Sequence, residues 1–154
     1  MTPTFFGRIQ TRIVMILTVG VLATLVITPF IPMDRAPGVS HLDALPESYA
    51  ITYSALAIVL VLGVVLWEPL YHFLQQFRWE KDWPALFGLL TGINEGILTY
   101  YVLMWIGPKP TDVGIPVSGF IIDFAFVWLA IFVFVNGPMR VVTLRWRFRG
   151  GRLL

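Results

Sequence analysis

The sequence contains no cysteine and only two histidines, and this scarcity excludes several kinds of site. Without cysteine the chain forms no disulfide, carries no thiol nucleophile and ligates no iron–sulfur cluster or zinc ion through sulfur. His41 and His72 lie outside the long apolar runs, on opposite sides of the membrane that those runs predict, so they do not suit a bis-histidine haem. His41 shares its loop with scattered carboxylates that lack any recognised ligand spacing. We therefore expect no metal site and no bound cofactor.

Charge is also scarce, at 13% of residues, whereas 57% are hydrophobic. In soluble domains about a quarter of all residues are charged. A helix crosses the hydrocarbon core with about 20 apolar residues, and four runs reach that length, at about 13–32, 50–67, 84–106 and 117–136. The first is longer than the core of a usual signal peptide and lacks a cleavage site, so we interpret it as a retained span. The composition predicts an all-α integral membrane protein, a four-transmembrane-helix bundle in one domain over 1–154.

The basic residues predict the orientation of these spans. Nine of the eleven Lys and Arg residues fall on one side of the predicted membrane, and only Arg35 and Lys109 fall on the other. Cytoplasmic loops carry the excess of Lys and Arg in membrane proteins. We therefore expect both termini to be cytoplasmic, in a protein of the cytoplasmic (plasma) membrane.

The loop between the second and third spans contains an amphipathic pattern over 68–82. Leu70, Phe73, Leu74 and Phe77 recur at the spacing of one helix face, and Pro69 suits the first turn of a helix. This predicts a short amphipathic helix in the cytoplasmic loop. The pattern is compatible both with a helix lying on the membrane and with one that docks on a partner.

The C-terminal tail, 139–154, alternates arginine with aromatic residues. Its basic residues are Arg140, Arg145, Arg147, Arg149 and Arg152. Each basic residue beside a membrane gains about 1 kcal/mol from anionic headgroups, so we expect the tail to bind anionic lipids at the cytoplasmic face. A protein-docking tail is the alternative, and we expect no nucleic-acid binding although arginine with aromatics also suits it.

The third and fourth spans each contain a carboxylate on a stripe of small residues. At roughly 100° per residue, Glu95 shares a helix face with Gly88, Gly92 and Gly96, while Asn94 points elsewhere. In the fourth span Gly119 and Asp123 share a face. Small residues let helices approach closely, so we expect these faces to pack against each other. Such packing predicts that the two carboxylates meet or converge on one water-filled cavity.

A charge at the bilayer centre costs at least about 2.5–3.5 kcal/mol and needs compensation. The predicted spans contain no Lys, Arg or His. Three alternatives remain for Glu95 and Asp123. They are neutral acids that hydrogen-bond across a helix contact, they hold a proton or cation that moves, or they pair with a basic group from another subunit or a bound cofactor.

Two functional hypotheses follow. The first is a non-catalytic accessory or assembly subunit of a larger membrane complex, because the chain offers polar groups on two faces, an amphipathic loop and a basic tail. Asn94 would then contact another helix or another protein. The second is a small homo-oligomeric proton- or cation-coupled transporter that uses Glu95 and Asp123. A membrane enzyme would need a Ser–His arrangement, a metal cluster or a haem ligand pair, and the sequence offers none of them.

Overall fold

The computed structural model describes residues 4–77, 85–109, 113–114, 116–143, 146 and 148–153. Within these residues the fold is helical apart from one short strand pair. The elements are, in chain order, α1 Phe5–Met15, η1 Ile16–Gly20, α2 Val21–Ile27, η2 Thr28–Phe30, β1 Asp34–Arg35, α3 His41–Leu62, η3 Gly63–Trp67, α4 Glu68–Gln75, α5 Ala85–Ile106, β2 Val113–Gly114, α6 Val117–Asn136 and α7 Pro138–Val142. Several of these elements join end to end, and η1 and η3 are π-helical turns inside longer helices.

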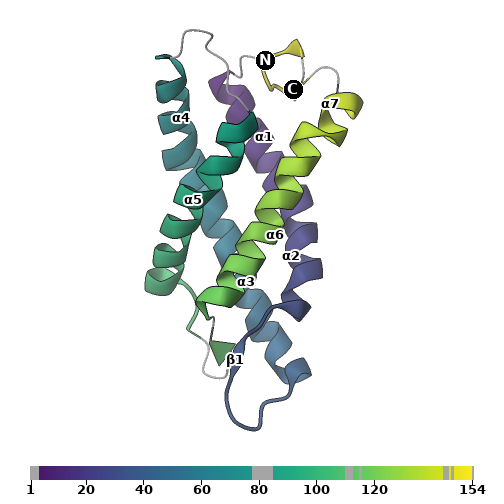
Figure 1. Ribbon diagram of the computed structural model, residues 1–154, viewed down its shortest axis with the longest axis vertical. Helices are drawn as coiled ribbons and strands as arrows, with labels where there is room; N and C mark the ends of the chain where they lie inside the picture. The colour runs from purple at the N-terminus through teal and green to yellow at the C-terminus, as the bar shows by residue number, and fades with distance from the viewer. Residues whose placement is uncertain are drawn as a thin grey trace.

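Four helices in the described residues are long and apolar enough to cross a membrane, as the sequence predicts: Phe5–Phe30, His41–Gln75, Ala85–Ile106 and Val117–Val142. Consecutive helices pack side by side, α2 on α3, α3 on α5 and α5 on α6, and α6 returns to η1 and α2. The four therefore close into a bundle, with the N- and C-termini at one end, which we call the terminal end (Figure 1). The opposite end, which carries β1, is called the loop end.

The first two membrane helices begin earlier than the apolar runs predict. Thr4 caps α1 by accepting a hydrogen bond from the Gly7 N–H, and the helix therefore starts eight residues before position 13. Ser40 caps α3 through the Asp43 N–H, so that residues 41–49, expected as loop, are helical. Polar capping residues define helix starts independently of hydropathy, and a search for apolar runs does not detect them.

The first part of the amphipathic segment is helical, as α4 over Glu68–Gln75. α4 continues from α3 through the π turn η3 without a break, and Pro69 lies inside one long helix from His41 to Gln75. Proline is tolerated there because a π turn already alters the backbone hydrogen bonds before it. Gln76 and Phe77 of the predicted helix form a turn, and 78–82 lie outside the described residues, including Arg78 and Lys81, which were used to predict the orientation.

The loop end is closed by a short strand pair and an apolar cluster. β1 pairs antiparallel with β2, with Asp34 opposite Gly114 and Arg35 opposite Val113. Beneath it lie buried residues from α3, α5, β2 and α6, namely Ala44, Ile51, Ala55, Leu103, Val113 and Phe120. This cluster, called the loop-end cluster, ties both connecting loops to the bundle.

The C-terminal segment folds back onto α1 rather than extending away from the bundle. The buried Trp146 donates from Nε1 to Thr11 Oγ1 at 2.7 Å, and the Leu153 N–H donates to Gln10 Oε1 at 3.0 Å. Gly150 and Gly151 have φ of 62° and 86°, a left-handed turn that suits glycine. The Gly150 carbonyl accepts hydrogen bonds from the backbone and the side chain of Thr4.

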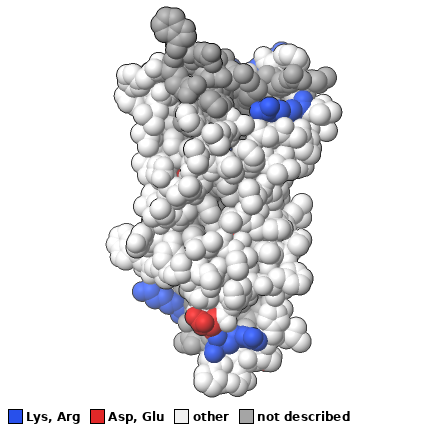
Figure 2. Space-filling model, in the orientation of Figure 1, with Lys and Arg blue, Asp and Glu red and all other residues white. Residues whose placement is uncertain are grey.

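The surface has an apolar middle between two charged ends. Figure 2 shows basic side chains near both ends of the molecule and almost only uncharged residues, drawn white, between them. Large apolar side chains are exposed along every membrane helix, for example Leu22, Val65, Ile93 and Val133. Such a contiguous apolar surface is what a bilayer covers.

Two alanine substitutions at glycine test how the C-terminal segment is held. A Cβ at Gly7 would overlap the Gly150 carbonyl oxygen, whereas a Cβ at Gly88 meets nothing closer than a Phe132 ring atom at 4.0 Å. We expect Gly7→Ala to lower the free energy of unfolding by about 1–3 kcal/mol, the usual cost of overpacking. Gly88→Ala should raise it by about 0.5–1 kcal/mol because alanine favours the helix.

The measurement is SDS-induced unfolding in mixed micelles, together with protease cleavage of the C-terminal segment. Faster cleavage is expected only in Gly7→Ala. Equal stability of the two variants would show that the segment is not docked on α1 as described.

Candidate functional site

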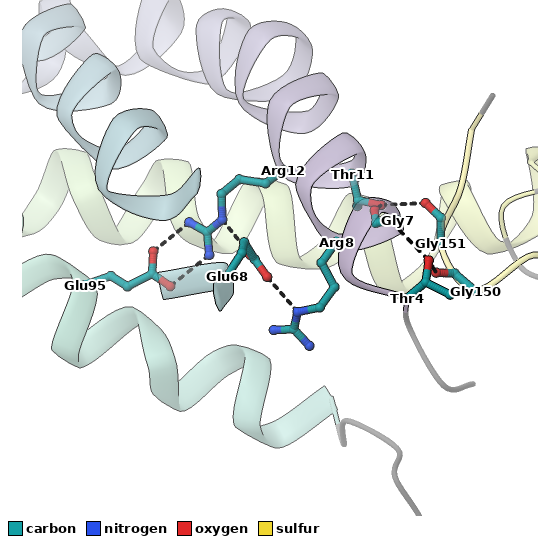
Figure 3. A network of polar contacts seen from close by, with 9 residues as sticks. All are labelled: Thr4, Gly7, Arg8, Thr11, Arg12, Glu68, Glu95, Gly150 and Gly151. Carbon is teal, nitrogen blue, oxygen red and sulfur yellow. Dashed lines mark hydrogen bonds and ion pairs between the residues drawn. The ribbon is translucent and has the colours of Figure 1, made fainter. Parts of the chain in front are cut away.

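Glu95 forms a two-armed ion pair with Arg12 of the same chain. Arg12 Nη1 lies 2.7 Å from Glu95 Oε2, and Arg12 Nη2 lies 2.9 Å from Glu95 Oε1 (Figure 3). Glu95 is only 1% exposed. It is ten residues from the start of the 22-residue helix α5, and hence about 15 Å along it at the usual helical rise. A parallel pair of N–H···O bonds is the strongest geometry available to an arginine and a carboxylate.

A second carboxylate, Glu68, extends the pair into a chain of four charges. Arg12 Nε donates to Glu68 Oε1 at 2.7 Å, and Arg8 Nε donates to Glu68 Oε2 at 2.6 Å (Figure 3). The side chains of Arg8, Arg12 and Glu68 are 8%, 11% and 8% exposed. The sequence Arg8–Glu68–Arg12–Glu95, called the ion-pair network, contains two positive and two negative groups and is neutral as a whole.

Local structure explains how these side chains meet. Arg8 and Arg12 are one helical turn apart and therefore share a face of α1. Glu68 directly follows the π turn η3, and Gly63 begins that turn. A Cβ at Gly63 would overlap the Arg12 side chain, so the glycine provides the space that the guanidinium occupies. Tyr71, one turn beyond Glu68, is buried, and Arg8 lies 5.9 Å from the centre of its ring.

The expectation that no basic residue of this chain reaches Glu95 is therefore wrong. It rested on placing Arg12 in a polar arm before the first span, whereas α1 begins at Phe5 and carries Arg12 into the bundle. Glu95 needs neither a partner subunit nor a cofactor for compensation, because the guanidinium neutralises it. Removing one member of such a buried pair leaves an unpaired charge and costs about 3–5 kcal/mol.

A cavity of about 300 Å³ lies inside the bundle beside the network. At the terminal end its lining includes the exposed Arg140, and Arg8, Arg12 and Glu68 line it further in. Thr24, Ala55 and Asp123 line its deepest part, where the loop-end cluster begins with Ala55. Asp123 is thirteen positions before Asn136, which also lines the cavity, a separation of about 20 Å along α6.

Asp123 is the carboxylate of the cavity lining that has no ion-pair partner within the described residues. It is 6% exposed, it lines the cavity, and its Oδ1 has no hydrogen-bond partner there. The Oγ1 atom of Thr24, 1% exposed on the same cavity, is equally without a partner. More than nine in ten buried polar groups in proteins are hydrogen-bonded. Asp123 Oδ1, Thr24 Oγ1 and the Trp128 Nε1 donor all lack a partner among the described residues, and all three residues line this cavity, which makes its deep part a candidate binding site.

Two aromatic rings of α6 form one wall of this site. Phe124 and Trp128 stack with their ring centres 5.6 Å apart, and both line the cavity. A Cβ at Gly92 would come within 2.6 Å of Trp128 Nε1, and one at Gly96 within 2.9 Å of a Phe124 ring atom. The glycines of α5 therefore leave the space that these aromatic rings of α6 occupy.

The other two glycines of the predicted stripes lie elsewhere. Gly88 lines the cavity and has no close neighbour, whereas Gly119 lies against the Pro32 carbonyl near the loop end. No hydrogen bond or ion pair between Glu95 and Asp123 occurs in the described part of the chain, since Arg12 occupies both Glu95 oxygens.

Asn94 and the basic tail lie on the surface. Asn94 is exposed on the apolar outside of α5, next to the exposed Ile93. Arg140 donates to Asn136 Oδ1 at 2.8 Å and is exposed, as are Arg149 and Arg152. Arg145 and Arg147 lie outside the described residues.

Sequence reasoning missed Arg12, Glu68, Gly63 and Thr24 as parts of the site. One signal was present, because Arg8 and Arg12 are spaced to share a helix face immediately before an apolar run. The space that Gly63 provides and the missing partner of Thr24 depend on tertiary contacts, which no local pattern encodes.

Comparisons with protein-family models, with curated proteins and with solved structures find no match to this chain.

A double-mutant cycle tests the ion-pair network. Arg12→Met leaves Glu95 unpaired and Glu95→Met leaves Arg12 with one partner too few, so we expect each to lower the free energy of unfolding by about 3–5 kcal/mol. The double variant keeps the Arg8–Glu68 pair and restores neutrality. It should lose less than the sum by at least about 2 kcal/mol.

The free energies are measured by SDS titration in mixed micelles. Arg35→Met, an exposed arginine at the loop end, is the control and should change stability by less than about 0.5 kcal/mol. Additive losses in the double variant would mean that Arg12 and Glu95 do not interact.

Proposed function

We propose that this chain is a small membrane transporter that exchanges a proton for a cation at Asp123. The observation that carries the proposal is the cavity of about 300 Å³ that extends from the terminal end to that unpartnered carboxylate. Membrane-embedded acids that face a cavity are commonly parts of ion or proton pathways. A proton and a cation compete for one carboxylate, so binding of either releases the other and couples their movement.

The carboxylates differ in whether an arginine pairs with them, and this difference supports the proposal. Glu95 and Glu68 are held by arginines and form a neutral, fixed scaffold. Asp123 has no such partner among the described residues, and we propose it as the acid that binds the cation. The transporter hypothesis from sequence gave Glu95 and Asp123 equal roles. In the present proposal Asp123 binds the cation and Glu95 positions α5 against α1.

A second hollow indicates where the path would continue. It lies at the loop end, has a volume of about 380 Å³, and is lined by Thr28 and Ser48 among others. Thr28 follows Thr24 by one helical turn, about 6 Å, and its hydroxyl oxygen lies 3.0 Å from that of Thr52. We propose that this Thr28–Thr52 contact and the loop-end cluster separate the two hollows and open in a second state, the alternation that transport requires.

The orientation of the bundle in the membrane belongs to the same proposal. We propose that the terminal end faces the cytoplasm of a plasma membrane, as the distribution of Lys and Arg favours. The exposed Arg140, Arg149 and Arg152 would then contact anionic headgroups. A homo-oligomer is the expected assembly, because four helices alone enclose a narrow path.

A second candidate function is the accessory subunit of a larger complex. Two surface features favour it. Asn94 places an amide on the apolar outside of α5, and α4 with the turn after it exposes Leu70, Phe73, Leu74 and Phe77. A polar group facing the membrane gains a hydrogen bond when another helix covers it, worth about 0.6 kcal/mol on average.

Cation-driven proton movement tests the transporter proposal. Proteoliposomes with pyranine inside receive Na⁺, K⁺ or an organic ammonium salt, and the internal pH is followed. We expect at least one cation to drive proton movement in the wild-type protein and Asp123→Asn to reduce the rate at least tenfold, because the amide neither binds a cation nor carries the proton.

Asp34→Asn, at an exposed carboxylate of the loop end, is the matched control and should keep the wild-type rate. If no cation moves protons, or if Asp123→Asn transports normally, exchange at Asp123 is refuted. Recovery of a defined complex with other chains from the native membrane would then favour the accessory subunit.

A further inference from the structure

The deep part of the cavity has a chemistry that specifies its ligand more closely than the word cation does. We propose that it binds a protonated primary or secondary amine with an apolar, preferably aromatic, body. This inference rests on the proposed function for its transport role, but the binding step stands on the cavity alone.

The unpartnered carboxylate oxygen at the site needs a hydrogen-bond donor. Among the described residues Asp123 Oδ1 and Thr24 Oγ1 both lack partners; the carboxylate oxygen accepts hydrogen bonds, and the threonine hydroxyl both accepts and donates them. Both residues are more than nine-tenths buried and line the same cavity. An ammonium group supplies a positive charge and an N–H donor to the carboxylate, and it has further N–H donors that the Thr24 hydroxyl can accept. The Trp128 N–H, also without a partner among the described residues, would face the aromatic body of the ligand.

The rest of the cavity lining favours a ligand with an apolar body. Phe124, Val127 and Trp128 contribute from α6, and Leu56 and Val59 contribute from α3. A cavity of about 300 Å³ lined mainly by apolar and aromatic side chains with a few polar groups is typical of a small-molecule site. Stacked aromatic rings also attract cations through their faces.

An inorganic cation fits the site poorly. Hard metal ions take six or more oxygen ligands at short distance, and among the described residues no group of three or more His, Cys, Asp or Glu is placed to hold a metal. The network arginines do not redirect the site to an anion, since Arg12 is bound by two carboxylates. The Asp123 carboxylate and the apolar lining of the cavity therefore both favour an organic ammonium ion as the ligand.

Direct binding to the purified full-length protein in detergent tests the inference without any gradient. The probe is phenethylammonium, measured by equilibrium dialysis. We expect saturable binding, at least tenfold tighter than that of 2-phenylethanol, which lacks the charge. Phenethyltrimethylammonium should also bind at least fivefold more weakly, because it keeps the charge but has no N–H to donate.

Three variants locate the site. Asp123→Asn should weaken binding roughly ten- to hundredfold, the range for a hydrogen bond to a charged group. Thr24→Val should weaken it about fivefold. Thr91→Val is the matched control, because Thr91 also lines the cavity but its hydroxyl already donates to the Gly88 carbonyl, and affinity should stay within twofold.

The outcomes separate this inference from the transport proposal. Binding in detergent without proton movement in vesicles would support the amine site and refute transport. Proton movement driven by Na⁺ or K⁺ with no phenethylammonium binding would overturn the amine site alone. Equal affinity for the ammonium, the trimethylammonium and the alcohol would also overturn it and leave the deep cavity to water. Because the ligand series uses the wild-type protein, it decides the question even if a variant fails to fold.

Discussion

The ion pair between Arg12 and Glu95 is the interaction on which the rest of this structure depends. It joins α1 to α5 through two short hydrogen bonds, and Glu68 links the same guanidinium to the end of the second membrane helix. Two of four membrane helices are thereby fixed to the first by buried charge. Because the network is neutral and each carboxylate is hydrogen-bonded, the bundle carries four ionised groups in a region where an isolated charge is costly.

The network also determines what is left for function. With Glu95 and Glu68 bound by arginines, Asp123 is the acid on the cavity without a partner among the described residues. The glycines of α5 contribute indirectly, since Gly92 and Gly96 make room for the Trp128 and Phe124 rings that line the same space. Fixed charges on one side and an open carboxylate on the other give the cavity its proposed selectivity for cations.

The sequence was sufficient for the architecture and for the candidate carboxylates. Four apolar runs predicted the four helices, and the small residues around Glu95 and Asp123 marked them as unusual. Hydropathy failed at the helix starts, because Thr4 and Ser40 cap helices in polar sequence. The cap at Thr4 places Arg8 and Arg12 inside α1. The pairing of Arg12 with Glu95 joins residues 83 positions apart and needs the space at Gly63, neither of which is visible in a local pattern.

Access to the deep cavity from the terminal end is directly measurable, because the sequence contains no cysteine. Val127→Cys introduces a single thiol on the cavity wall, and Val133→Cys introduces one on the exposed outside of the same helix. A charged, membrane-impermeant methanethiosulfonate reagent is applied to oriented vesicles from each side. We predict that the thiol at position 127 reacts from the terminal side alone and that the thiol at position 133 reacts from neither side. Reaction at position 127 only from the loop side, or from neither side, would contradict it.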